Sequence, residues 1–270
     1  MLILYIVLIT TLFVLLYHKL LYDIFAKGGL FMITDTKNQT FVSPYPLSDL
    51  SKEVAAPSIR EPGSAITHFI AMLFSIFGAF LLLPKAFLHT DRRYFVSMLL
   101  FVSCMILLYT ASTCFHTFDI NPKINTILKK MDHMMISVFI AATYTPICLL
   151  CLPEKTGLAL LIIVWSIAVL GIIIKAFFVF CPKWVSSILY IGMGWSCLLA
   201  FPTLYHSLSR PAFLWLLTGG IIYTIGGILY ALKLPILEKL PKNFGIHEIF
   251  HLFVMGGSLC HFILMYAYLL

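Results

Sequence analysis

Charged residues are scarce in this chain. Asp, Glu, Lys and Arg make up 11% of its 270 residues, whereas apolar residues reach 61%, and the mean hydropathy is +1.01. A soluble domain carries roughly 25% charged residues, so this chain lacks the polar residues that cover a soluble globule. That shortage excludes intrinsic disorder and a cytosolic enzyme. The apolar residues fall in runs long enough to cross a bilayer, which predicts an all-α polytopic membrane protein.

Acidic residues and paired cysteines are also few. The net charge is +7, from 18 basic and 11 acidic residues. In a membrane protein this excess is typical of basic cytoplasmic loops, and no basic stretch stands apart from the apolar runs, so we expect no nucleic-acid partner.

The seven cysteines are odd in number, and Cys148 and Cys151 form one C-x-x-C without a second pair. We expect buried thiols, not a disulfide framework.

Eight apolar segments are candidate membrane spans. Each has about 20 residues, which matches a hydrocarbon core of about 30 Å, and each must be a helix because lipid cannot satisfy free backbone amides. They are Leu2–Phe25, Gly63–Leu83, Tyr94–Phe118, Asp132–Leu152, Gly157–Phe178, Trp184–Leu208, Phe213–Leu232 and His247–Leu270.

Three regions follow from this pattern. Residues 1–25 are expected to form an extra N-terminal transmembrane helix, because no basic residue precedes the apolar run and no cleavage site follows it. Residues 26–62 read as a polar cytoplasmic linker with several prolines. Residues 63–270 are expected to form a membrane domain of seven helices.

Basic residues predict the orientation. The linker side of the seven-span core holds twelve: Lys27, Lys37, Lys52, Arg60, Lys123, Lys129, Lys130, Lys175, Lys183, Lys233, Lys239 and Lys242. The other side holds five: Lys85, Arg92, Arg93, Lys155 and Arg210. The linker side is therefore expected to face the cytoplasm and the C-terminus to lie outside the cell, in the plasma membrane.

Polar residues at three span ends fall in one shallow cytoplasmic layer. Ser112 and His116 lie near the end of one span, Asp132 starts the next, and His247 and His251 open the last. Residues four apart share a helix face, so His247 and His251 can both point at one metal ion, with His116 as a third nitrogen. Three nitrogens with an open fourth position are typical of catalytic zinc. Asp132 is then expected to accept a proton from zinc-bound water, with Ser112 hydrogen-bonding nearby.

The remaining intramembrane histidines have simpler interpretations. A single histidine at a helix end is more often an interfacial or core residue. His68, His133, His206 and His261 do not together form a set of possible metal ligands. His261 lies about 15 Å beyond His251 along a helix, too far to bind the same ion, and is expected to be a core or proton-relay residue.

A rival motif occupies the last span. Residues His247 to His251 read H-E-x-x-H, the zincin protease signature in which Glu248 would be the general base. No acidic residue follows Glu248 to serve as a further ligand, and Val254 stands where the metzincin extension requires glycine. A membrane metalloprotease is therefore the weaker hypothesis.

Six segments in order resemble the hemolysin III family, which is related to progestin and adipoQ receptors, hence to adiponectin receptors, and more distantly to alkaline ceramidases. The segments are Glu61–His68, Ser112–His116, Asp132–His133 with Ala142–Pro146, Gly192–Trp195, Gly219–Gly220 with Tyr223, and His247–His251. The resemblance covers about residues 60–270. Ser64 departs from it, because the family usually has asparagine there.

The resemblance implies seven core helices and a zinc ion (Zn2+) near the cytoplasmic face. It implies His116, His247 and His251 as ligands, Asp132 contacting the metal through water, and Ser112 lining the site. Adiponectin receptors have glutamine at the position of Glu248, which argues against Glu248 as a catalytic base.

Three functions follow. The first is a zinc-dependent hydrolase that cleaves an amide or ester bond of a membrane lipid. The second is a cytolytic, pore-forming protein, for which the spans lack amphipathic polar stripes. The third is a non-enzymatic membrane-homeostasis regulator or receptor with structural zinc.

Overall fold

The computed structural model describes residues 59–232 and 245–270. The predicted N-terminal span 1–25 and most of the linker 26–62 lie outside these residues. Within the described part, seven helical segments are long and apolar enough to cross a membrane, as expected for the core. Six of them contain α2 (Pro62–Phe87), α3 (Arg92–Thr117), α4 (Pro122–Leu150), α5 (Glu154–Phe177), α8 (Arg210–Leu232) and α9 (Ile246–Leu264), and α9 continues as a π-helical turn, η5 (Met265–Leu269).

The remaining span is built from three pieces: α6 (Lys183–Gly194), a 3₁₀ segment η3 (Trp195–Ala200) and α7 (Phe201–Ser207). Tyr144 of α4 stabilises the break, since its hydroxyl donates to the carbonyl of Gly194 and accepts from the amide of Cys197 at 3.0 Å. Pro202 lies in the first turn of α7, where its missing amide hydrogen costs no helical bond.

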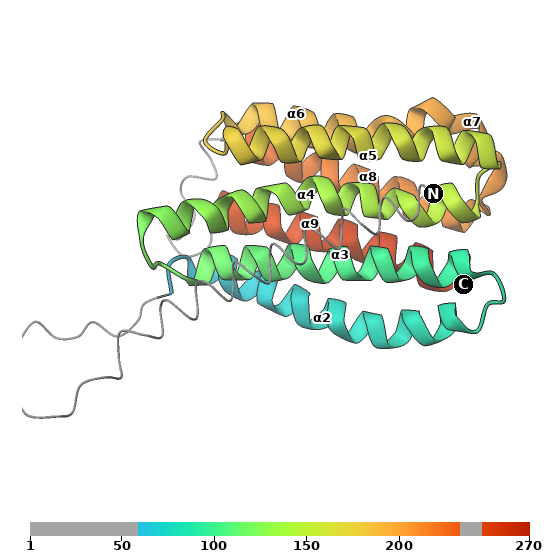
Figure 1. Cartoon of the computed structure of the whole chain (residues 1–270), viewed down its shortest axis with the longest axis horizontal. Helices are drawn as coiled ribbons and strands as arrows, with labels where there is room; N and C mark the ends of the chain where they lie inside the picture. Colours follow the sequence, from blue (N-terminus) through green and yellow to red (C-terminus); the bar gives the residue numbers. More distant parts are fainter. Residues whose placement is uncertain (1–58, 233–244) are drawn as a thin grey trace, which may run out of the picture. The chain divides into compact units, whose positions relative to one another are not determined.

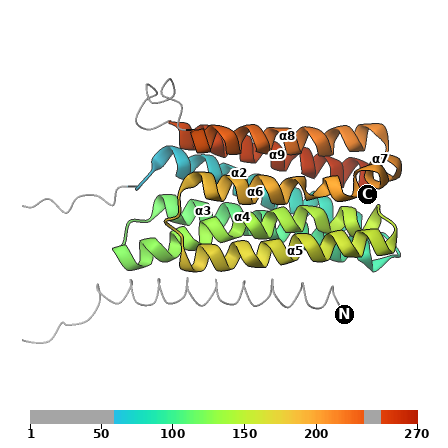
Figure 2. The same cartoon turned by 90° about the horizontal axis from the view of Figure 1, so that it is seen from above.

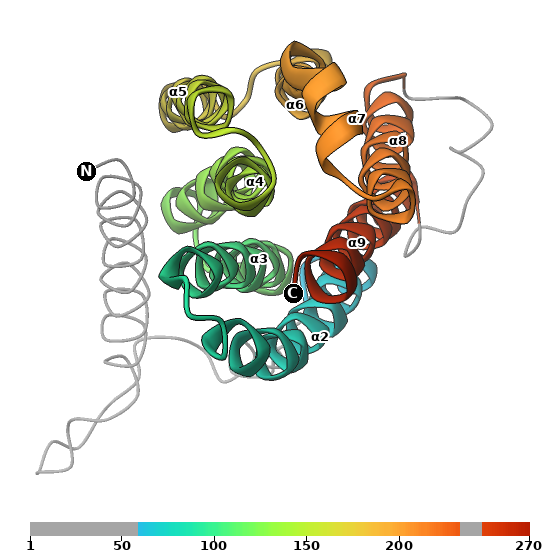
Figure 3. The ribbon, with the colours of Figure 1, turned by 90° about the vertical axis from the view of Figure 1, so that its right-hand side faces the viewer.

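The helices of the described part pack in a closed order, as Figures 1, 2 and 3 show from three directions. α3 contacts α2 and α4, α4 contacts α5 and α6, and α8 contacts α6 and α9. Contact between α2 and α9 closes the order. Because successive spans alternate in direction, the N-terminal ends of α2, α4 and α9 and the C-terminal end of α3 lie at the same end of the bundle.

Large apolar side chains face outward from this bundle. Phe74 and Phe80 on α2, for example, are 69% and 74% exposed. In water such faces would mark docking surfaces, whereas in a bilayer they contact lipid tails. Many polar side chains instead lie inside, including His68, Ser112, Asp132 and His251. This distribution is that of a multi-pass membrane protein.

The start of α4 differs from the prediction. Asp132 was expected to open its span, but the helix begins ten residues earlier, at Pro122. The Asn121 side chain caps this helix by accepting from the amide of Ile124 at 2.9 Å. Asp132 therefore lies about three turns inside α4. The apolar run missed this extension because its first turns carry lysines, but Asn-Pro is a helix-start signal that the sequence displays.

Candidate metal centre

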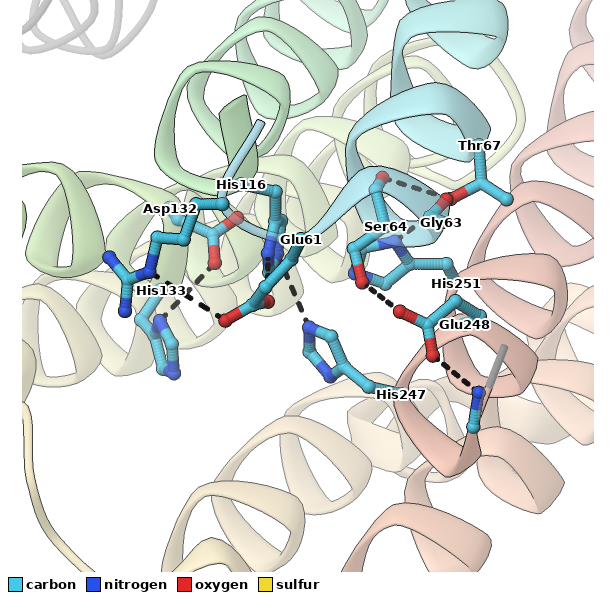
Figure 4. Close-up of polar contacts among 12 residues, drawn as sticks. Glu61, Gly63, Ser64, Thr67, His116, Asp132, His133, His247, Glu248 and His251 are labelled. Carbon is cyan, nitrogen blue, oxygen red and sulfur yellow. Dashed lines mark hydrogen bonds and ion pairs between the residues drawn. The ribbon is translucent and has the colours of Figure 1, made fainter. Parts of the chain in front are cut away.

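Three histidines from two helices meet at the common end of the bundle. Ligand nitrogens of His116, His247 and His251 all lie within 4.8 Å of one another. The Nε2 atoms of His116 and His247 are 3.2 Å apart, as Figure 4 shows. His116 and His251 are buried, and His247 is partly buried. The structure thus brings together the three histidines that the sequence analysis singled out.

Backbone contacts between α2 and α3 fix the position of His116. It lies in the last turn of α3. Its carbonyl accepts from the amide of Glu61 at 2.9 Å, and the Thr117 carbonyl accepts from Arg60 at 3.3 Å. These bonds use carbonyls that the end of α3 leaves without intrahelical partners. Since α2 also packs on α9, the start of α2 holds His116 beside the first turns of α9.

Glu61, which immediately precedes α2, and Thr67 on α2 hold the outer ring nitrogens. Nδ1 of His116 lies 2.6 Å from Oε2 of Glu61, and Nδ1 of His251 lies 3.2 Å from Oγ1 of Thr67 (Figure 4). The hydrogen bond with His116 holds the pKa of the Glu61 carboxyl below its ordinary value. With Nδ1 engaged, Nε2 remains for coordination, an arrangement common among metal-bound histidines. Glu61 lies in the predicted linker, so its role beside His116 was not predictable from the apolar spans.

The distance between two of the ligand nitrogens fits a small tetrahedral metal ion. Zinc–nitrogen bonds of about 2.0–2.1 Å at tetrahedral angles place two ligand nitrogens about 3.3 Å apart. The observed 3.2 Å between the Nε2 atoms of His116 and His247 is close to that edge. The site can therefore hold a metal ion through three imidazoles and leave a fourth position for another ligand.

Asp132 and Ser112 flank this group. Asp132 is buried, and its Oδ2 lies 3.4 Å from Nδ1 of His133. The same His133 nitrogen donates to the carbonyl of Lys129 at 2.9 Å, so it compensates the Asp132 charge only in part. Ser112 is buried, and its Oγ has no hydrogen-bond partner among the described residues. Two polar groups next to the histidines thus keep bonding capacity for a ligand.

His68 is closer to the site than predicted. The sequence predicts no partner for it, but its ring stacks on that of His251, with centroids 3.5 Å apart and planes 9° apart. It also meets Tyr109 edge-on at 5.0 Å. This contact was not predicted because His68 and His251 lie on α2 and α9, and no spacing within one helix reveals a contact between two. His68 is not one of the three clustered ligands, so it acts on the site by holding the ring of His251.

Glu248 points away from the histidines. Its Oε1 accepts from the Ser64 hydroxyl, and its Oε2 accepts from the amide of Gly245 at 2.7 Å (Figure 4). The second bond satisfies an amide at the start of α9, and the first joins α2 to α9. Ser64 thus has a polar role, although it departs from the family pattern. Both carboxylate oxygens are engaged in holding helix ends, which argues against the zincin interpretation.

A long apolar cavity extends from the site into the membrane domain. Its volume is about 170 Å³, and Ser112, Asp132, His247 and His251 line one end. Its wall continues along α9 to His261 and along α8 to Phe213. From His247 to His261 the helix rises about 21 Å. The cavity therefore has the length and the apolar lining that suit a lipid chain, with the polar cluster at one end.

Comparisons with known proteins identify the family of this chain. A family model described as Haemolysin-III related matches residues 58–262. "Hemolysin-3" of Bacillus cereus is 39% identical over 211 residues, which cover 78% of this chain and 92% of that protein. "Hemolysin-3 homolog" of Bacillus subtilis (strain 168) is 40% identical over 209 residues, or 77% of this chain and 94% of that protein.

A more distant relative is the "ADIPOR-like receptor IZH2" of Saccharomyces cerevisiae, 29% identical over 180 residues, which cover 59% of this chain and 54% of that protein. The family match spans most of the chain and includes every residue of the three-histidine group. The chain therefore belongs to the haemolysin III family of integral membrane proteins.

Proposed function

We propose that this protein is a zinc-dependent hydrolase that cleaves an acyl amide or ester bond of a membrane lipid. The observation that carries the proposal is the three-histidine group beside Asp132 and Ser112, at one end of a long apolar cavity. Zinc bound by three nitrogens polarises a carbonyl and lowers the pKa of a water to about 7.

The chain's own groups have distinct tasks in this proposal. Asp132 accepts the proton of the attacking water and passes it to the leaving amine or alcohol. The free hydroxyl of Ser112 donates to the oxygen that becomes negative. Glu61 and Thr67 keep His116 and His251 in the orientation that coordination requires. The apolar cavity holds the acyl chain and excludes bulk water from the reacting bond.

The proposed membrane orientation follows from the basic residues. Lys123, Lys129, Lys130, Lys175 and Lys183 lie at the bundle end that holds the histidines, and Lys85, Arg92, Arg93, Lys155 and Arg210 lie at the other. We propose that the histidine end faces the cytoplasm at the plasma membrane and that the C-terminus faces outward. The substrate then enters from the inner leaflet.

Release of fatty acid tests the proposal. Purified protein loaded with zinc is incubated with ceramide, phospholipid and acyl-amide substrates, and the released fatty acid is measured by mass spectrometry. We expect release from at least one class, and none after a chelator removes the metal. Readdition of zinc should restore it. A zinc-replete protein that releases nothing from any substrate would instead favour a regulator with a structural metal.

The names of the bacterial relatives raise cytolysis as an alternative. The cavity gives that function little support, because its wall is mostly apolar and offers ions no continuous polar path. Leakage of dye from liposomes, measured with the same purified protein, separates the two. Leakage that persists in an Asp132→Asn variant would favour a pore.

Substitution of Glu248 distinguishes the proposal from a zincin protease. In Glu248→Gln the side-chain carbonyl can still accept from Gly245, so we expect zinc content and lipid hydrolysis within about threefold of the wild type. Removal of a general base costs about 10²- to 10⁴-fold. A loss of that size with zinc retained would restore Glu248 as the base, and the hydrolysis assay above measures it.

A further inference from the structure

A second polar site lies deep in the cavity, far from the clustered histidines. His261 is 6% exposed and lines the cavity wall. Its Nδ1 is buried and has no hydrogen-bond partner among the described residues. An imidazole in an apolar membrane interior is costly unless both ring nitrogens find partners, so this side chain is positioned for a partner that the fold itself does not provide.

The surroundings hold His261 in place without giving its Nδ1 atom a hydrogen-bond partner among the described residues. Its ring stacks on Tyr223, with centroids 5.6 Å apart. The Tyr223 hydroxyl is hydrogen-bonded to the Ser258 hydroxyl at 3.0 Å. The Ser258 hydroxyl also accepts from the Tyr109 hydroxyl at 2.7 Å. Gly219 makes room for the imidazole, because a Cβ there would lie 3.1 Å from its Nε2. The packing fixes the ring and leaves hydrogen-bonding capacity.

The depth of His261 in the membrane indicates how far along an acyl chain a polar group would contact it. It lies ten residues, or about 15 Å, beyond His251 on the same helix. That distance is about half of a hydrocarbon core of about 30 Å. An acyl chain whose carbonyl lies at the clustered histidines therefore reaches His261 well along its length, remote from its headgroup.

We propose that His261 binds a hydroxyl group carried in the middle or distal part of the substrate's acyl chain. A neutral imidazole offers one donor and one acceptor, and a hydroxyl can both donate and accept, so it matches either tautomer. The substrate class is then a lipid with a hydroxylated acyl chain. This inference rests on the proposed use of the cavity for an acyl chain, and it concerns selectivity, not the chemistry of cleavage.

Competition binding with free fatty acids tests the inference without requiring turnover. Purified full-length protein is incubated with the fluorescent fatty acid cis-parinaric acid, and displacement of the probe by stearic, 12-hydroxystearic or 2-hydroxystearic acid is measured. On the wild type we expect 12-hydroxystearic acid to displace the probe at about tenfold lower concentration than stearic acid, the effect of one buried hydrogen bond. The 2-hydroxy acid carries its hydroxyl near the carboxyl and should behave as stearic acid does.

Variants assign the preference to one side chain. His261→Phe should lose it, and His261→Gln, which keeps a donor and an acceptor, should retain part of it. His206→Phe makes the same change at an exposed residue outside the cavity wall and should leave the preference intact. Equal affinities on the wild type, or a preference that survives His261→Phe, would overturn the inference but leave the acyl cavity standing. If no fatty acid binds, both proposals fail. The wild-type comparison decides even where a variant does not fold.

Discussion

Single replacement of His116, His247 or His251 by alanine is expected to remove zinc from the protein. Structural zinc sites bind with about 10–16 kcal/mol, so one of three protein ligands accounts for roughly 4 kcal/mol, or about a thousandfold in affinity. Wild-type protein should contain about one zinc per chain. Each variant should contain less than a tenth of that at submicromolar free zinc, as measured by elemental mass spectrometry.

Neighbouring residues give graded controls for this prediction. Glu61→Gln replaces the charged acceptor beside His116 with a neutral amide, and Thr67→Val removes the hydroxyl beside His251. Each should weaken zinc affinity by about 10- to 100-fold. His206→Ala, at an exposed position, should leave zinc content unchanged. If His116→Ala keeps a full complement of zinc while His247→Ala loses it, the metal is not shared between α3 and α9, and the proposed centre is wrong.

The variant His68→Ala tests whether His68 binds the metal or only packs against His251. Its ring covers His251 by stacking, yet it is outside the group of clustered ligand atoms. The effect of His68→Ala on zinc affinity should therefore be close to that of Glu61→Gln. A loss as large as that of His251→Ala would make His68 a fourth ligand and close the open position on which the hydrolase proposal depends.

The parts of this site that the sequence predicted are those encoded within one helix. The four-residue spacing of His247 and His251 places both on one face of α9, and the alternation of spans places His116 at the same end of the bundle. The count of basic residues also places these span ends on one side of the membrane. These features are readable from the sequence because the bilayer itself imposes helical periodicity and alternating spans.

Contacts between helices were not predictable in the same way. Glu61 precedes α2 and reaches His116 of α3, and His68 of α2 stacks on His251 of α9. Both depend on how α2 rotates against its neighbours, which hydropathy does not specify. Even within α4, the apolar run predicted the first residue of the helix wrongly. A helix can extend beyond the hydrocarbon core wherever water or a capping residue satisfies its end.

Asp132→Asn is expected to abolish lipid hydrolysis while zinc stays bound. The amide has nearly the shape of the carboxylate, so the contact with His133 can persist, but it cannot accept a proton from water at neutral pH. General-base catalysis contributes about 10²- to 10⁴-fold, and the released fatty acid should fall by that factor. Elemental analysis of the same sample should give a zinc content within a factor of two of the wild type.

Asp119→Asn is the matched control, since Asp119 is exposed between α3 and α4 at the same bundle end and accepts from the Asn125 side chain at 2.6 Å. It should hydrolyse lipid at the wild-type rate. Lipid profiles of membranes containing wild-type, Asp132→Asn or Asp119→Asn protein extend the comparison to natural substrates, because the substrate should accumulate with the first variant alone. If Asp132→Asn loses zinc together with activity, its carboxylate holds the metal site and another group must accept the proton. If it keeps both, no proton passes through Asp132 during hydrolysis.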